Sequence, residues 1–544
     1  MADMDKKGVV YNDEKGVPVI DEDGHYKDGG VVGAMGPGKT GLKRQLKNRH
    51  IAMISIGGVI GTGLFLGTAG SLRSGGPVGL LLGYSIMGTI TYAVMVCLGE
   101  MIAYLPIPGG HIMLAERFVD PAFSFTMGWN YWYNWIIILP AELSASAVLI
   151  NYWTTSVNNA VWVTICLVVV FIINMFGAGV YGECEFWFAS IKVLTITGLI
   201  ILGLVLDLGG GPNHDRLGFR YWKNPGPFAQ YNGIPGNEGR FLAWWSVMTQ
   251  AAFSFIGTEI VAIAAGEAKN PRKNLPKAIK RVYIRILLFY ILGTFFIGLL
   301  VPYNNPDLNL SASNAAKSPF VIAIKTAGIS GLPSLINACL LTSAWSAASS
   351  DLFTSSRALY GLSLAGNAPK LFSRTTRGGL PYVSIIFCGL FGTLAYMAIS
   401  TSAGKVFGWF ANMTAVAGLM TWFGIAVTYI RFHAGLKAQG IDRRTLPYRG
   451  LFQPYLGWYV AVSTLVICFF SGWSVFLKGS WDVTNYLPLA LFPVLYIGAK
   501  FVMRKPIVRA AEMDFYSGID EILAESFDEP KAKTWYGKVW AFLM

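Results

Sequence analysis

Ionisable side chains occur deep inside several long apolar stretches of this sequence, where an uncompensated charge is costly. Glu142 lies in the segment PAELS and Lys192 in the segment FWFASIKVLT. Such residues are rare at bilayer depth and are functional candidates by default, above all as members of proton relays. We therefore expect Glu142 and Lys192 to be proton-coupling groups, which bind and release a proton during a conformational cycle.

Other buried charges have structural interpretations that compete with a functional one. Glu259, in FSFIGTEIVAIAAGEA, could contact a substrate or accept backbone hydrogen bonds at a break in its own helix. Lys192 could snorkel toward the inner membrane interface. Asp351 and Arg357, which lie six residues apart, are expected to form an ion pair near the cytosolic end of their span.

The stretch 54–67, ISIGGVIGTGLFLG, is apolar enough to enter a bilayer, although five of its fourteen residues are glycine. Broken backbone is tolerated at this depth only where it is buried in protein or lines a wet cavity. We expect a break at Gly61, Thr62 and Gly63, with a half-helix that begins near Leu64. Its free N–H groups and positive dipole end suit a carboxylate. The alternative is that these small residues only allow a neighbouring helix to pack closely.

The elements that position these residues are membrane spans. Apolar residues make up 53% of the 544 residues and charged residues only 13%, which is far below the share in soluble domains. The class is therefore an all-α integral membrane protein. Twelve stretches approach the spanning length of about 20 residues. They are 51–72, 78–104, 124–150, 160–180, 185–206, 242–266, 282–302, 332–358, 381–400, 405–430, 455–477 and 485–504.

Basic residues orient these spans. Lysines and arginines are concentrated before the first span and after the even-numbered spans 6, 8, 10 and 12, which places both termini in the cytosol. The net charge of +13 is thus a topology signal and not a nucleic-acid patch. The six cysteines show no metal or disulfide spacing, and no nucleophile–base constellation indicates an enzyme. We expect no metal and no cofactor. GAMGPGKT at 33–40 has the spacing of a phosphate-binding loop but lacks the strand before it.

The chain divides into five segments. Residues 1–50 are a polar tail, expected to be disordered, and 505–544 form a second cytosolic tail. Both tails are candidate contact segments for trafficking or ubiquitin machinery. Spans 1–5 cover 51–206 and spans 6–10 cover 242–430, with two further spans at 455–504. Paired broken spans at matching places in two halves mark a transporter's substrate site, and the run from Phe253 to Glu259 would be the second break. Asn309 is a candidate glycosylation acceptor.

Motifs along nearly the whole membrane region resemble those of the fungal amino acid permeases, the yeast amino acid transporter family of the amino acid–polyamine–organocation superfamily. The motifs are RHIAMISIGGVIGTGLFLG, LGEMIAYLPIPGG, EFWFASIKV, NEGRFLAWWSV, FSFIGTEIVAIAAGEAKNPRKNLPKAIKRV and SDLFTSSRALYGLSLAG. The resemblance implies a LeuT-like fold, with a 5+5 inverted repeat, broken helices 1 and 6 and two extra helices. It also implies proton-driven uptake of amino acids at the plasma membrane.

The resemblance assigns roles within the two breaks. Backbone at the first break would bind the substrate carboxylate, freed carbonyls would accept from its ammonium, and Phe253 would cover the occupied site as a gate. The candidate substrate-binding residues are Ser55, Ile56, Gly61, Thr62, Gly63, Phe253, Ser254, Gly257 and Glu259. FIGLLVPYN slightly favours aspartate and glutamate as substrates; Ser346, Asn412 and Thr414 are neutral donors. A broad or neutral permease, an uncoupled exchanger and a non-transporting sensor remain alternatives.

Overall fold

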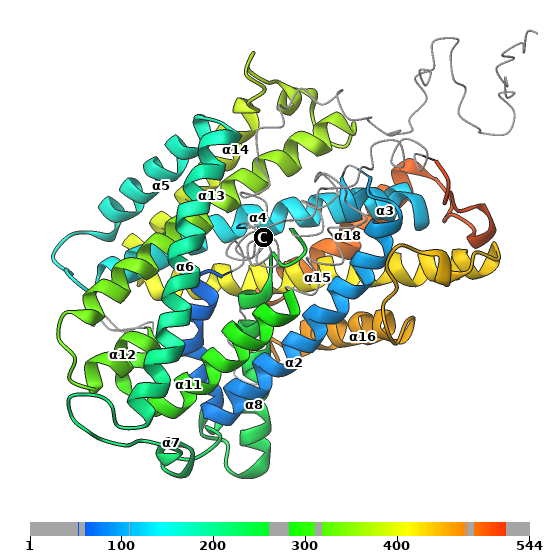
Figure 1. The fold of residues 1–544 in the computed structure, drawn as a ribbon. Helices are drawn as coiled ribbons and strands as arrows, with labels where there is room; N and C mark the ends of the chain where they lie inside the picture. The colour runs from blue at the N-terminus through cyan, green and yellow to red at the C-terminus, as the bar shows by residue number, and fades with distance from the viewer. Residues whose placement is uncertain are drawn as a thin grey trace, which may run out of the picture.

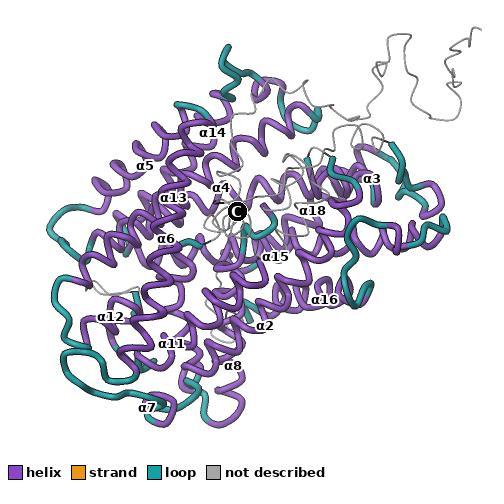
Figure 2. The backbone as a smooth tube through the Cα atoms, viewed as in Figure 1, coloured by secondary structure: helices purple, strands orange, loops and turns teal. Residues whose placement is uncertain are grey.

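The computed structural model describes residues 53, 60–107, 109–260, 282–309, 318–473, 475 and 483–517. Within these residues the chain is helical and contains no strand (Figure 2). Six helical stretches of the described chain are long and apolar enough to cross a membrane. They are Gly63–Tyr104, Pro121–Ile150, Ala178–Asp207, Val282–Leu300, Tyr382–Ile399 and Ala403–Ala438. The all-α membrane class is confirmed, whereas the number of twelve spans stays a prediction.

The first break has the expected position in the described part of the chain. Ile60 is not helical, a π-helical turn η2 covers Gly63–Gly67, and α2 continues over Thr68–Tyr104. The described helix therefore begins one residue before the predicted start near Leu64, and the broken first span stays a prediction. Residues 54–59, with the predicted contacts Ser55 and Ile56, lie outside the described residues. Within α2, Gly76 has a φ of 74° and is followed by Pro77, so the helix axis is interrupted there, between the predicted spans 51–72 and 78–104.

The second break follows α8, Gly236–Phe255. The chain leaves helical geometry at Ile256 and turns through Gly257, whose φ of 91° is a left-handed value that favours glycine. Residues 261–281 lie outside the described residues, so the continuation of this span is not part of the observed fold. Figure 1 shows α8 beside the blue N-terminal part of α2, and the two helices pack along one another.

Three long helices form the centre of the molecule. They are α4 (Pro121–Ile150), α13 (Leu332–Leu364) and α15 (Ala403–Ala438). Figure 1 shows α4 and α15 side by side through the middle, and α13 packs on α4 as well. Most residues of α4 are buried, including most of those with polar side chains, because the helix is surrounded by protein. Asp120 caps its first turn by accepting from the Phe123 N–H at 2.7 Å.

The remaining helices surround this centre. A short helix, α3 (Gly110–Phe118), connects α2 to α4, and α5 (Asn159–Met175) and α6 (Ala178–Asp207) follow α4. The others are α7 (Arg220–Lys223), α11 (Leu292–Leu300), α12 (Pro319–Thr326), α14 (Tyr382–Phe391), α16 (Tyr455–Phe470) and α18 (Leu487–Met503). Because α6 begins at Ala178, the predicted start of span 5 at residue 185 was too late.

The segment after α18 packs against the helical body. Phe515 is fully buried and its ring contacts the rings of Tyr104, Phe118 and Phe432, which belong to α2, α3 and α15. The Val508 N–H donates to the Val119 carbonyl at 2.8 Å. This part of the predicted C-terminal tail is therefore docked, whereas the predicted amphipathic segment 519–527 lies outside the described residues.

Candidate functional site

The two breaks lie against each other. A Cβ atom on Gly63 would be 2.8 Å from the Ser254 Cα and 3.1 Å from the Phe253 ring, so no larger residue fits without a shift of α8. Ser254 is also tied to α2 by a 2.7 Å hydrogen bond between its Oγ and the Tyr84 hydroxyl. The predicted site residues Gly63, Phe253 and Ser254 are thus brought together by direct packing of the helix that begins at one break on the helix that ends at the other.

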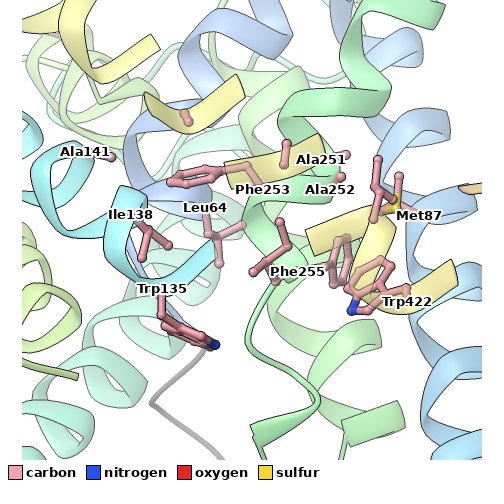
Figure 3. Close-up of a cluster of buried hydrophobic side chains, with 14 of the residues drawn as sticks. Leu64, Met87, Trp135, Ile138, Ala141, Ala251, Ala252, Phe253, Phe255 and Trp422 are labelled. Atoms are coloured by element: carbon pink, nitrogen blue, oxygen red, sulfur yellow. The ribbon is translucent and has the colours of Figure 1, made fainter. Parts of the chain in front are cut away.

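Phe253 closes the space between these breaks and α4. It is only 4% exposed, and its ring meets Phe407 of α15 edge-on at 5.7 Å between centroids. Figure 3 shows its side chain directed toward Ile138 and Ala141 of α4, with Leu64 beside it. The residue predicted as a gate therefore separates the start of the Gly63 helix from the face of α4.

The first break also contacts the intramembrane carboxylate of α4. The Thr62 hydroxyl donates to Oε1 of Glu142 at 2.7 Å. A Cβ on Gly61 would lie 3.7 Å from the same oxygen, which is ordinary contact. Oε2 of Glu142 is buried and has no hydrogen-bond partner among the described residues. One carboxylate oxygen of Glu142 is therefore bound to the first break, and the other is bound by none of the described residues.

Lys192 lies near the middle of α6 and is fully enclosed by protein. Its side chain has no exposed surface, and its Nζ is 3.8 Å from Oε1 of Glu185. The other Glu185 oxygen accepts a 2.6 Å hydrogen bond from the Ser346 hydroxyl of α13. The alternative interpretation, in which Lys192 snorkels to the interface, does not agree with this burial, because the ammonium pairs with Glu185 on the same helix.

These charges belong to one buried cluster between α4, α6 and α13. Lys192 interacts electrostatically with Glu142, and Asp351 interacts with Glu142, Glu185 and Lys192. We call these four residues the charge cluster. It contains three carboxyl groups and one amine, all of them buried, so it is suited to hold protons rather than three uncompensated negative charges. Groups with metal-ligand geometry are absent from the described residues.

The contacts of Asp351 and Arg357 differ from the ion pair that we expected. The Arg357 guanidinium lies over the Phe353 ring, 3.1 Å from its centroid, and Nη1 donates to the Phe353 carbonyl. Asp351 is directed to the charge cluster instead. The two residues are six positions apart on α13, where 3.6 residues per turn put them on different faces.

Uncharged polar groups line α4 and α15 close to the breaks. Asn134 is 1% exposed, and neither its Oδ1 nor its Nδ2 has a partner among the described residues. Thr414 is likewise buried with an unpartnered hydroxyl. Buried polar atoms are normally satisfied by protein or water, so each of these two residues is a candidate contact for a bound polar molecule. Of the other predicted donors, Ser346 is bound to Glu185 and Asn412 is only partly buried.

Glu259 lies at the second break and is 1% exposed. Trp422 donates from Nε1 to Oε2 of Glu259 at 3.2 Å, and the carboxylate interacts with the backbone N–H groups of Gly257 and Glu259. These contacts agree with the structural interpretation, in which Glu259 holds the broken backbone. The adjacent Thr258 accepts from the Arg285 guanidinium at 3.3 Å, so a buried cation is present at this break.

Sequence reasoning missed Glu185, Asn134 and Arg285. Glu185 stands seven residues before Lys192, a spacing that puts both on one face of a helix, but it was taken as the end of the span rather than its interior. Asn134 was recognisable as an amide within an apolar run, and Arg285 as a charge within span 7.

The sequence is similar to those of known proteins along most of its length. Residues 50–511 match the model of the amino acid permease family. The chain is 43% identical to a proline-specific permease of Emericella nidulans over 514 residues, which are 92% of this chain and 93% of the relative. It is 42% identical to a lysine-specific permease of Saccharomyces cerevisiae over 538 residues, 98% of this chain and 86% of the relative. A dicarboxylic amino acid permease of the same yeast is 41% identical over 504 residues, with coverage of 91% and 83%.

Proposed function

The chain belongs to the amino acid permease family, and on that basis we propose that it is a proton-coupled importer of L-amino acids at the plasma membrane. It is a transporter and not an enzyme, as its named relatives are permeases. We infer both termini to be cytosolic from the distribution of basic residues. The observation that carries the proposal is the contact between two broken spans at Gly63 and Ser254, next to a buried charge cluster.

We place the substrate backbone at the first break. The first turn of the helix that begins at Gly63 has N–H groups without intrahelical partners, and the dipole there favours a carboxylate. Backbone at Gly61, Thr62 and Gly63 would donate to it, and carbonyls at Ser55, Ile56, Phe253 and Ser254 would accept from the ammonium. Phe253 covers the site. Gly257 and Glu259 maintain the non-helical backbone of the second break and are the remaining substrate-binding residues.

Proton coupling rests on the charge cluster. The hydroxyl of Thr62 joins the substrate-binding break to Glu142 over 2.7 Å, so movement of the break changes the surroundings of that carboxyl group. Lys192 is the second coupling group, held by Glu185. A proton taken up from outside would stabilise the substrate-bound packing, and its release to the cytosol would loosen that packing. No cofactor takes part in this scheme.

The favoured substrates are acidic amino acids, with broad or neutral selectivity as the alternative. A buried carboxylate side chain requires a cation or several donors, and Arg285 is a buried cation beside the second break. The 41% identity to a dicarboxylic amino acid permease is compatible with this choice. Similar identity to proline- and lysine-specific relatives is compatible with the alternative, and the uncharged pair Asn134 and Thr414 suits neutral side chains.

The proposed architecture has twelve spans, as an inverted repeat of 51–206 and 242–430 followed by 455–504, in the LeuT-like arrangement. Residues 1–50 and 505–544 would be cytosolic tails that trafficking or ubiquitin machinery can bind. Two long helices, α4 and α13, occupy corresponding third places in the two proposed halves, and their packing on each other supports this proposal.

Uptake by cells that lack their own amino acid permeases tests the proposal. We expect labelled amino acids to accumulate, with aspartate and glutamate competing most strongly, and a protonophore to abolish accumulation. Accumulation that survives the protonophore would identify an uncoupled exchanger. An absence of any uptake by protein at the cell surface would contradict transport and favour a sensor.

A further inference from the structure

A buried histidine in α3 has no role in the scheme above. His111 is the second residue of α3 and has no exposed surface, and neither ring nitrogen has a hydrogen-bond partner among the described residues. A buried polar group that lacks a hydrogen-bond partner destabilises the arrangement that buries it. A phenylalanine would fill the same place without that cost. The histidine is therefore best explained by a second arrangement of the protein in which its nitrogens are solvated.

His111 is the first member of a column of three rings that leads to the second break. Its ring meets Tyr131 of α4 edge-on, with 5.1 Å between centroids, and Tyr131 meets Trp135 edge-on at 5.9 Å. The Trp135 ring is 3.1 Å from the position that a Cβ on Gly257 would occupy. Figure 3 shows Trp135 on the α4 side of this region, below Ile138.

The column extends between the second break and the exposed residue Gly109. Tyr131 lies near enough to Glu259 for an electrostatic interaction, so the inner end of the column adjoins the buried carboxylate of the second break. At the other end, Gly109 precedes His111 by two residues and is exposed. The proposed topology puts this surface in the cytosol, because α3 follows the second span.

We propose that His111, Tyr131 and Trp135 form the closed inner gate of the transporter, and that His111 is its positioning and proton-sensitive residue. This inference rests on the proposed function. Opening of the gate exposes the imidazole to cytosolic water, where it binds a proton. The imidazolium cannot return to its unsolvated place against Tyr131, so protonation holds the gate open.

Among the residues that the structure describes, no charged group offsets the burial of His111. On the elements packed against α3, Tyr131 of α4 faces the imidazole, Glu100 of α2 is bound to Arg443, and Arg431 of α15 is bound to the Phe118 and Val508 carbonyls. Burial alone lowers the pKa of His111, from 6.5 to about 4.

The lowered pKa of His111 determines how pH affects the stability of the closed gate. A histidine whose pKa is lowered in the closed gate stabilises that gate fully above its ordinary pKa. The stabilisation is lost as the pH falls from 6.5 toward 4. Acid on the cytosolic side therefore opens the gate.

Counterflow exchange in proteoliposomes of the full chain tests the gate. Labelled substrate exchanges for unlabelled substrate while the external pH is fixed and the internal pH is stepped from about 7.5 to about 5.5, across the histidine range. Because exchange requires no net proton movement, the driving force does not enter. We expect the exchange rate of the unsubstituted protein to rise at least about threefold as the internal pH falls, because acid opens the gate. The rate of His111→Phe should not change with internal pH. His111→Gln, which keeps hydrogen-bonding atoms but does not titrate there, should behave in the same way.

A second histidine provides the matched control. His433 on α15 is partly exposed, and His433→Gln should keep the pH profile of the unsubstituted protein. An internal-pH profile that persists in either His111 variant would overturn the inference, and so would its loss in His433→Gln. Failure of the unsubstituted protein to exchange any amino acid would instead contradict the proposed function.

Discussion

Glu100 and Glu142 are both buried carboxylates, with 0% and 2% exposure, but their oxygens are satisfied very differently. Both oxygens of Glu100 accept from the Arg443 guanidinium, at 2.7 and 3.0 Å, and Oε2 also accepts from the Gly450 N–H at 3.1 Å. Glu142 accepts one bond from Thr62, and its second oxygen has no partner among the described residues. Equal burial therefore serves two different purposes.

The difference shows where the molecule is rigid and where it can change. Glu100 joins the end of α2 to the segment after α15 through a bidentate pair, which is the strongest geometry for a carboxylate. Glu142 is bound to a helix break by a single hydroxyl and shares its charge environment with Lys192. A change of protonation at Glu142 alters one contact, whereas loss of Glu100 would leave the partly exposed Arg443 guanidinium with only its bond to the Gly450 carbonyl. We therefore expect stability to depend on Glu100 and transport to depend on Glu142.

The largest effect is expected for Glu100→Ala. Removing the Glu100 carboxylate leaves the partly exposed Arg443 guanidinium without its anionic partner and the Gly450 N–H without its acceptor, so we expect a loss of about 3 kcal/mol. Thermal unfolding of the purified protein should show this loss, and little folded protein should reach the membrane. Glu142→Gln, measured in the same way, should change stability by less than about 1 kcal/mol. Equal destabilisation by the two substitutions would remove the distinction between them.

Gly63→Val should have the next largest effect, and on transport rather than on surface expression. Its Cβ would lie within 2.8 Å of the Ser254 backbone, so the two breaks are forced apart and the carboxylate site is covered. We expect initial uptake rates to fall at least about 100-fold, equivalent to about 2.7 kcal/mol. Gly70→Val is the control on the same helix, because nothing lies within 4 Å of its Cβ position. Normal uptake by Gly63→Val would remove the proposed site.

Phe253→Ala should have a smaller effect on uptake. Loss of the ring opens the space toward α4 and removes the edge-on contact with Phe407, and aromatic contacts of this kind contribute about 0.5–1.5 kcal/mol beyond their buried area. We expect uptake to fall about tenfold, with Phe253→Tyr and Phe253→Trp retaining a measurable part. If alanine and tyrosine variants transport alike, Phe253 is packing and not a gate.

The positions of the breaks could be predicted because their signals are local. Glycines next to apolar runs are visible in the sequence, and the helices begin at Gly63 and end at Phe255 within a residue or two of the expected places. The kink at Gly76 follows from Gly-Pro in the same way. The apolar length of the spans similarly predicted an all-helical membrane protein.

The contacts between helices could not be predicted, because they depend on axial register. Glu185 was missed since α6 begins at Ala178, seven residues before the predicted start, and an apparent end residue is in fact interior. The pairing of Thr62 with Glu142 joins residues 80 positions apart, and no periodicity within either helix fixes that alignment. The same limit explains why Asp351 was matched to Arg357 and not to the charge cluster.

Substrate-evoked proton entry tests the central claim most directly. Proteoliposomes with a pH-sensitive dye inside receive substrate outside, for the unsubstituted protein, Glu142→Gln and Lys192→Met, with substrate binding measured on the same preparations. For the unsubstituted protein, we predict that the pH inside the vesicles falls when substrate is added outside. Both variants should bind substrate and keep exchange activity while proton entry falls below about a tenth. Proton entry that is undiminished in both variants would contradict the assignment of coupling to the charge cluster.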